Sequence, residues 1–257
     1  MCLLAVQYQL VPEAPLLVAA NRDEFYDRPT QTPSIHSGKP RVLAGLDERA
    51  GGTWLGVNQH GLFVAACNRP KLLPPIAPRS RGLLCRDLLR MGSARQAVDQ
   101  ALEELSGGAY EGVNYVIADA ESGWVVHAAD DVEVVELEEG LSVLSNCDVN
   151  DRTNERVKLA HRLLTLQLLD SPVKFLAVAS KVFARPPAAP GRPGMVLRGR
   201  ERGTVSSTLV ALGQKPRDAI FQYSMGPPDS TAYQDFSPLL RDILSRGLRE
   251  ARTKAKA

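Results

Sequence analysis

The sequence predicts an α+β protein in which two antiparallel β-sheets stack face to face between layers of helices, a four-layer αββα sandwich. Short apolar strands follow one another in pairs joined by tight turns. Such pairs indicate antiparallel sheets, because parallel strands need long crossover connections. Helical patterns also arrive in pairs, and each pair can cover the outer face of one sheet. The pattern by itself equally allows a two-layer α+β domain.

Five pairs of strands are expected along the chain. The first joins residues 2–8 to residues 16–20 through the turn VPEAP, where proline and small residues interrupt the apolar runs. The second has the turn residues NQHG between its strands. The later strand pairs, in order from the second to the fifth, are 53–57 with 62–68, 114–118 with 124–129, 132–137 with 141–145, and 207–212 with 219–224.

Two pairs of helices and one final helix are expected between and after these strands. The predicted helices cover residues 80–91, 94–106, 151–169, 172–184 and 238–250. Ser93 and Gln96 have the spacing of a capping box at the start of the second helix. Residues 185–203 are rich in proline, glycine and arginine and predict a long solvated loop, with a basic lid over a site as the alternative. We expect residues 1–257 to form a single domain.

Composition excludes several classes of function. The chain has 257 residues, a formal net charge of +2, and apolar and charged fractions of 44% and 23%, which are ordinary for a globular protein and give no reason to expect nucleic acid as a partner. Its four cysteines lack the spacing of a zinc site, a c-type haem site or a disulfide framework, which favours a reducing compartment. The first residues contain no basic segment and no transmembrane segment. We therefore expect a cytoplasmic protein, and its four histidines show no metal-binding spacing.

Cys2 is a candidate nucleophile because it directly follows Met1. If Met1 is removed, Cys2 carries both a thiol and a free α-amine. An α-amine titrates near ~8 and a thiol near ~8.5, so the amine can act as the general base of the thiol, and the thiolate is the reactive form. The alternative is that Cys2 is only a small apolar residue at the start of a strand.

Four polar residues follow the second predicted strand: Asn21, Arg22, Asp23 and Glu24. In a tight hairpin the end of this strand lies beside the start of the first, so we expect these side chains next to Cys2. Arg22 could lower the pKa of the thiol or hold a substrate carboxylate with its two-pronged guanidinium. Asp23 could hold the α-ammonium group or orient Arg22. The alternative is a salt-bridge network without a catalytic role.

Several segments resemble a known family. The segments are MC at the start, AANRDEFYDRP (19–29), GGTWLGV (51–57), GVNYVIAD (112–119), LSN (144–146) and GT (203–204). They resemble, in the same order, the NRDE family, whose eukaryotic member is Transport and Golgi organization protein 2. This resemblance implies an N-terminal nucleophile (Ntn) hydrolase-like αββα fold. We also expect Asn21, Glu24 and Trp54 to contact the substrate, with packing between the sheets as the favoured alternative for Trp54.

A more distant resemblance implies a mechanism. The segment GVNQHGLFVAACNRP (56–70) is similar to a strand–turn–strand of Ntn hydrolases related to bile-salt hydrolase and penicillin acylase. The resemblance assigns to Asn68 the role of oxyanion donor and places Asn146, from GLSVLSN, beside the nucleophile. The alternative for both asparagines is capping at the end of a strand. The chain departs from the family pattern at Val205, where most members have arginine, and at Gln222 and Tyr223.

Two functions of different classes remain open. In the first, Cys2 attacks a linear amide, Asn68 and Asn146 stabilise the oxyanion, Arg22 and Asp23 position the reactants, and water releases the acyl group; no cofactor is required. In the second, the family's link to haem trafficking and to lipid or acyl-CoA homeostasis implies a carrier whose pocket holds haem or acyl-CoA as cargo without cleaving it. Arginines such as Arg22 would then bind the propionates or the phosphates.

Overall fold

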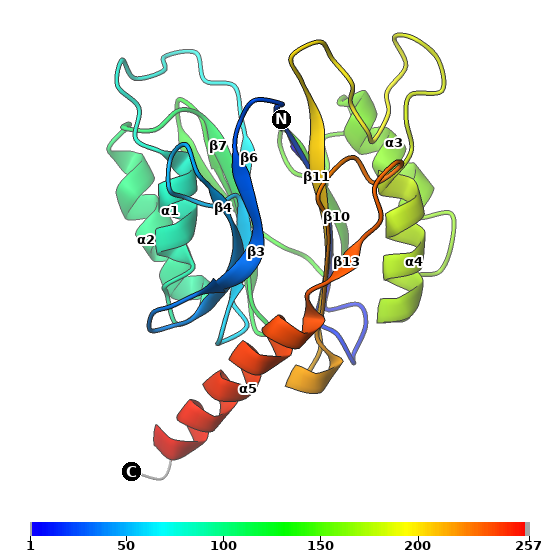
Figure 1. Ribbon diagram of the computed structural model, residues 1–257. Helices are drawn as coiled ribbons and strands as arrows, with labels where there is room; N and C mark the ends of the chain where they lie inside the picture. Colours follow the sequence, from blue (N-terminus) through cyan, green and yellow to red (C-terminus); the bar gives the residue numbers. More distant parts are fainter. Residues whose placement is uncertain (1, 255–257) are drawn as a thin grey trace.

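Two antiparallel sheets face each other between two pairs of helices in the computed structural model, which describes residues 2–254 (Figure 1). Sheet A has the strand order β10-β1-β2-β11-β12-β13, and sheet B has the order β3-β4-β5-β6-β7-β8-β9. All of the strand pairs of both sheets are antiparallel. The predicted α+β class and the αββα arrangement are therefore confirmed.

The strands of sheet A come from the two ends of the chain and from its middle. They are β1 (Cys2–Tyr8), β2 (Leu16–Phe25), β10 (Gly140–Leu144), β11 (Arg202–Leu212), β12 (Ile220–Ser224) and β13 (Gln234–Asp235). The strands of sheet B are nearly consecutive: β3 (Thr30–His36), β4 (Val42–Asp47), β5 (Leu55–Asn58), β6 (Phe63–Asn68), β7 (Val113–Ala118), β8 (Gly123–Ala128) and β9 (Val132–Glu136).

Each helix pair covers one sheet, as the sequence predicts. Helices α1 (Arg81–Leu88) and α2 (Ala94–Ser106) pack on sheet B, and α3 (Glu155–Leu164) and α4 (Pro172–Phe183) pack on sheet A. Ser93 caps α2 by accepting a hydrogen bond from the backbone N–H of Gln96, as expected from the capping-box spacing. Helix α5 (Ser237–Lys254) lies at the end of the sandwich opposite the start of β1 (Figure 1).

Three details differ from the prediction. Strands β3 and β4 are absent from it, because β3 is a polar edge strand that contains Pro33, and proline is tolerated only at such an edge. The expected hairpin of residues 132–137 and 141–145 does not form, since β9 pairs with β8 and β10 pairs with β1 in the other sheet. The expected loop 185–203 ends early, because β11 begins at Arg202.

The site lies at the boundary between the two sheets. Side chains alternate along β2, so that Leu16, Val18 and Ala20 face sheet B while Leu17 and Ala19 face the helices α3 and α4. β2 continues to Phe25, so the four polar residues lie inside the strand and not after it. The alternation therefore separates these polar residues onto two faces.

Candidate functional site

The β1–β2 hairpin brings Cys2 directly opposite Arg22. Residues that are paired in this way project their side chains to the same face of a sheet, so the thiol and the guanidinium lie side by side. The hairpin register follows from the turn between Tyr8 and Leu16, which are themselves paired. The proximity expected from the sequence is present.

A cavity of about 330 Å³ opens beside Cys2. It is lined by six of the eight residues predicted for the site, which are Cys2, Arg22, Asp23, Glu24, Trp54 and Asn68. The end of the β6–α1 loop and the start of α1 complete the wall with Pro78, Arg79, Ser80 and Arg81. The cavity is therefore formed where the N-terminal hairpin of sheet A meets the ends of the strands of sheet B.

Cys67 is a partner of Cys2 that the sequence analysis did not assign to the site. It lies buried on β6 and faces Cys2 across the space between the sheets. A hydrogen bond from the Cys67 thiol lowers the pKa of Cys2 to about 7, against the opposing effect of burial, and the backbone N–H of Asp23 also lowers it. The same interaction with Cys2 and burial raise the pKa of Cys67 well above its ordinary value, so Cys67 remains a donor.

Arg22 stacks on the indole ring of Trp54. Its guanidinium carbon lies 4.1 Å from the ring centroid, and its Nη1 lies 3.3 Å from the hydroxyl of Thr30. Within the described part of the chain, no carboxylate forms an ion pair with Arg22. Trp54 fits against the backbone at Gly45, where an added Cβ would come within 2.4 Å of the ring. The position of the guanidinium is therefore fixed by an aromatic face, and its charge is available to the cavity.

Asp23 is anchored by residues from two distant parts of the chain. Its Oδ2 lies 2.6 Å from Nη1 of Arg156 at the start of α3, and its Oδ1 accepts a hydrogen bond of 2.6 Å from the Thr204 hydroxyl. Gly203 is required beside it, because an added Cβ would lie 2.5 Å from the backbone carbonyl oxygen of Leu197. The GT pair of the sequence therefore holds Asp23 in place, and Val205 lies at an irregularity in the pairing of β11 with β2.

The other charged groups of the cavity are paired. Arg28 forms a two-pronged contact with Asp47, with Nη2 2.6 Å from Oδ2, and Glu24 lies 3.9 Å from the same guanidinium. Arg79 pairs with Glu104 and Arg81 pairs with Glu111 at 2.6 and 2.9 Å. Arg22 therefore differs from the other arginines of the wall.

Asn68 ends strand β6 and is half-buried at the cavity. Its side-chain amide forms no hydrogen bond with any other residue that the structure describes. An amide with free N–H groups beside a nucleophile can donate to a negatively charged oxygen. This position agrees with the role that the resemblance implied for Asn68.

Asn21 and Asn146 lie elsewhere. The fully buried Asn21 is on the opposite face of β2, where its amide donates hydrogen bonds of 2.9 Å to the carbonyls of Phe183 and Met195. Substrate contact by this amide, as expected from the sequence, is therefore wrong, because period-two alternation turns it toward α4. Asn146 does not line the cavity, and its Oδ1 lies 3.5 Å from the amide of Asn154, the N-cap of α3.

A second polar network fixes the segment after β10 beside Cys2. Asn114 donates hydrogen bonds of 3.1 and 2.9 Å to the carbonyls of Ser145 and Cys147, and the Ser145 hydroxyl donates to the Cys2 carbonyl at 2.9 Å. His127 Nδ1 lies 2.8 Å from Asn114 Oδ1, while its Nε2 accepts from the backbone N–H of Val149. Burial lowers the pKa of His127, which agrees with a neutral, structural histidine.

The arginine-rich segment 185–203 does not cover the cavity. None of its residues lines the wall, and Met195 and Val196 are fully buried against sheet A. The backbone carbonyls of Gly194 and Met195 accept hydrogen bonds from Arg156, the residue that anchors Asp23. This segment therefore contacts the residue that holds Asp23. The expected solvated loop is wrong for its buried part.

Among residues 2–254, no group of three or more histidine, cysteine, aspartate or glutamate side chains could hold a metal ion. No helix within that range combines the length and the apolar character needed to cross a membrane.

A family comparison matches the first two thirds of the chain. The family described as Transport and Golgi organisation 2 matches residues 1–175. The mouse Transport and Golgi organization 2 homolog is 37% identical over 111 residues, which are 40% of this chain and 38% of the relative. The bovine homolog is 38% identical over 120 residues, 43% of this chain and 42% of the relative. The matched segments thus span only about two fifths of these relatives.

Solved structures share the fold at low sequence identity. The Caenorhabditis elegans ortholog of N-acylethanolamine-hydrolyzing acid amidase superposes with a TM-score of 0.53 and 14% identity, covering 81% of this chain and 92% of that one. Penicillin V acylase from Agrobacterium tumefaciens superposes with a TM-score of 0.53 and 13% identity, and the match covers 92% of this chain and 86% of that one. A variant of the conjugated bile acid hydrolase from Clostridium perfringens superposes with a TM-score of 0.51 and 12% identity, and the match covers 93% of both chains. Identities this low show a shared fold alone.

Proposed function

Because this chain belongs to the Transport and Golgi organisation 2 family and has an Ntn-hydrolase-like fold, we propose that it is an amidohydrolase whose nucleophile is Cys2 and whose substrate is a linear acyl amide. One observation carries the proposal. The Cys2 thiol, with a pKa of about 7, shares a cavity with the guanidinium of Arg22 and with the amide of Asn68, which has no hydrogen-bond partner among the described residues. A nucleophile, a cation and an oxyanion donor are the groups that acyl transfer needs.

The first step is acylation of the sulfur. A pKa of about 7 gives Cys2 a substantial fraction of thiolate near neutral pH. The thiolate attacks the amide carbonyl carbon, and the carbonyl π electrons move to oxygen, where an N–H of Asn68 donates to the oxyanion. The tetrahedral intermediate then breaks its C–N bond, and the leaving amine takes a proton from the α-ammonium group. A thioester and a free amine are the products of this step.

The second step is hydrolysis of the thioester. The neutral α-amine takes a proton from water as the water oxygen attacks the thioester carbonyl, and the C–S bond breaks to regenerate the Cys2 thiolate and release a carboxylic acid. This use of the α-amine requires that Met1 is removed, since otherwise the amine belongs to another residue. Arg22 would hold a polar or anionic part of the acyl group, since its fork is not occupied by a carboxylate of the described chain.

Activity and mass measurements test the proposal together. Intact-mass spectrometry of the purified protein should show loss of Met1, and a library of acyl amides should contain substrates whose turnover disappears in Cys2→Ala. The matched control is Cys147→Ala, which removes another half-buried thiol outside the cavity and should keep full activity. Rapid quenching should trap an acyl adduct on the peptide that contains Cys2. Turnover that persists in Cys2→Ala, or a protein that retains Met1 while remaining active, would contradict the mechanism.

One observation also favours a second candidate, a carrier of haem or acyl-CoA. The guanidinium of Arg22, which forms no ion pair with a carboxylate of the described residues, could bind a propionate or a phosphate without any covalent step. A volume of about 330 Å³ is at the lower end of the range for small-molecule sites, and it suits an acyl amide better than either cargo. Titration of haem and of acyl-CoA into wild type and Arg22→Gln distinguishes the two functions, because the carrier requires saturable micromolar binding that the variant weakens.

A further inference from the structure

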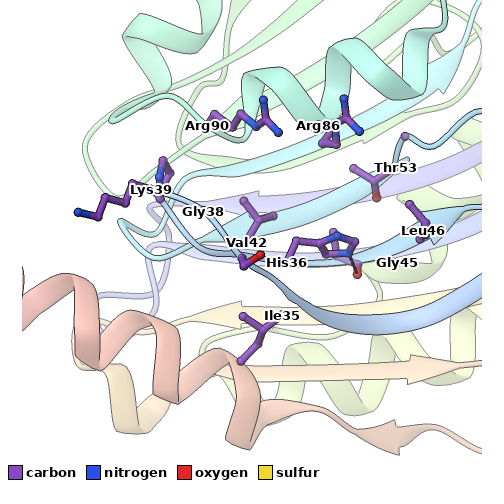
Figure 2. Close-up of a pocket in the computed structure, with 14 residues that line it drawn as sticks. Ile35, His36, Gly38, Lys39, Val42, Gly45, Leu46, Thr53, Arg86 and Arg90 are labelled. Atoms are coloured by element: carbon purple, nitrogen blue, oxygen red, sulfur yellow. Dashed lines mark hydrogen bonds between the residues drawn. The ribbon is translucent and has the colours of Figure 1, made fainter.

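A second and larger cavity lies outside the proposed catalytic site. Its volume is about 530 Å³, and it lies between the β3–β4 hairpin and helix α1 (Figure 2). The segment around Gly52 and Thr53 forms its third side, and Thr53 also lines the cavity of Cys2. The two cavities are therefore neighbours with separate sets of charged residues.

The charged residues of this second cavity are all basic. Lys39, Arg86 and Arg90 line it, and its wall contains no aspartate or glutamate. Figure 2 shows Arg86 and Arg90 on the helix side of the cavity, facing the strand that carries Val42, whereas the Lys39 side chain extends away from them. The two arginines therefore supply the positive charge inside, and Lys39 adds to it at the edge.

Carboxylates do not neutralise these two arginines by direct hydrogen bonds. Asp87 Oδ1 lies 3.8 Å from Arg86 Nε and 3.6 Å from Arg90 Nη1, beyond ordinary hydrogen-bond distance. Asp87 contributes one negative charge and the carbonyls at the end of α1 about half of one, which together are less than the three positive charges of Lys39, Arg86 and Arg90. The cavity therefore has an excess of positive charge.

Hydrogen-bond donors are also unused there. Arg86 Nη1 donates to the Gly51 carbonyl at 2.9 Å, which fixes the guanidinium, and its Nη2 forms no hydrogen bond with any residue that the structure describes. A guanidinium that is fixed in place and keeps free N–H groups at a cavity can donate to an acceptor that binds there. An anion with several oxygens can use donors from both arginines at once.

The strand side of the cavity is apolar. Val42, Ala44 and Leu46 line it, and the His36 ring is held in place by a contact of 3.0 Å between its Nε2 and the Ala44 carbonyl. An occupant that matches both sides carries an anionic group and an apolar or aromatic body. The volume of the cavity is within the range for a drug-sized molecule.

We propose that this cavity is a binding site for a small organic phosphate, with the phosphate at Arg86 and Arg90 and the organic body on Val42 and Leu46. Phosphate is favoured over carboxylate because its three terminal oxygens can accept from two planar guanidinium forks, whereas one carboxylate satisfies one fork. The proposal does not depend on hydrolysis at Cys2. A protein inactive on amides can still bind the phosphate here.

Isothermal titration calorimetry of the full chain with phenyl phosphate tests the site. Wild type should bind phenyl phosphate saturably, and inorganic phosphate should compete, whereas benzyl alcohol, which has a similar body without the charge, should not bind. Replacing Arg86 and Arg90 together by glutamine should weaken binding by tenfold or more, as expected when charge-assisted hydrogen bonds are lost. Arg90→Gln alone, at an exposed side chain that does not support the fold, should weaken it measurably.

The matched control is Arg95→Gln. Arg95 is an exposed arginine on α2 that pairs with Asp99 and does not line the cavity, so its loss should leave binding unchanged. Thermal unfolding of each variant checks that the fold is retained. The inference is overturned if wild type shows no saturable binding of phenyl phosphate, or if Arg90→Gln and the double variant bind it as tightly as Arg95→Gln does. Equal binding of benzyl alcohol would also overturn it.

Discussion

Cys67 faces Cys2 across the space between the two sheets, and the interaction between the two thiols lowers the pKa of Cys2. One residue begins the first strand of sheet A, and the other lies near the end of β6 in sheet B. The contact therefore connects the proposed nucleophile to the opposite sheet and lowers its pKa.

Removal of this donor should raise the pKa of Cys2. In Cys67→Ala the thiolate loses its hydrogen bond while burial still disfavours its charge, so the pKa should rise from about 7 and less thiolate should be present at neutral pH. The pH profile of alkylation of Cys2 by iodoacetamide, followed by peptide mass spectrometry, should then shift to higher pH. Cys67→Ser keeps a donor and should shift the profile less. An identical profile in Cys67→Ala and wild type would exclude this role.

Loss of the amide of Asn68 should slow the chemical step. Asn68→Ala removes the proposed oxyanion donor, and kcat should fall about 10²- to 10³-fold with little change in KM, because the interaction strengthens only in the transition state. Steady-state kinetics on the best acyl amide measures this. Asn146→Ala is the comparison, since Asn146 lies outside the cavity lining and its loss should have a small effect. Equal losses in both variants would contradict the assignment of the oxyanion donor to Asn68.

Lysine should not replace arginine at position 22. Arg22→Lys keeps the charge but loses the planar stack on Trp54 and the two-pronged geometry. KM for an acyl amide that carries a carboxylate should rise about tenfold, as expected for the loss of a bidentate contact, while KM for a neutral amide should change less. Arg49→Lys is a matched control, because Arg49 lines the same cavity but is half-exposed and pairs with Asp27. If the two substrates respond alike to Arg22→Lys, the guanidinium does not contact the carboxylate.

The contact of Arg156 with Asp23 should contribute to stability. Both side chains are largely buried, and Arg156→Met removes the positive partner of a buried carboxylate, so the free energy of unfolding should fall by about 3–5 kcal/mol. Urea denaturation followed by circular dichroism measures the change. Arg152→Met, at an exposed position just before α3, should change the free energy of unfolding by less than about 0.5 kcal/mol. Similar stabilities of the two variants would show that the pair contributes nothing.

Much of the sandwich could be predicted because its signals are local. The alternation of apolar residues and the short turns specify four of the five expected hairpins, and the register of the first one places Cys2 beside Arg22. Strand β3 gave no such signal, because an edge strand needs no apolar face and accepts Pro33. Strand β10 was assigned to the wrong partner, because nearness in sequence favours a hairpin until the competing edge of β1 is known.

Local pattern also misjudged which polar residues share a face. The sequence places Asn21 next to Arg22, but β2 continues through both, and a strand turns neighbouring side chains to opposite sides. A strand that ended at Ala20 would have left both free to face the cavity. The extension is decided by the long β11, which pairs with β2 as far as Phe25.

Sequence alone is enough to predict the class of fold, the hairpin that holds Cys2, and the group of residues from which a site could be built. These features depend on strand periodicity, turns and register, which act over a few neighbouring residues. Only the tertiary structure decided that Cys67 contacts Cys2, that Arg156 and Thr204 hold Asp23, and that the wall contains Asn68 but not Asn146. These contacts join residues more than sixty positions apart, and no local pattern encodes which distant side chain fills the space that packing leaves.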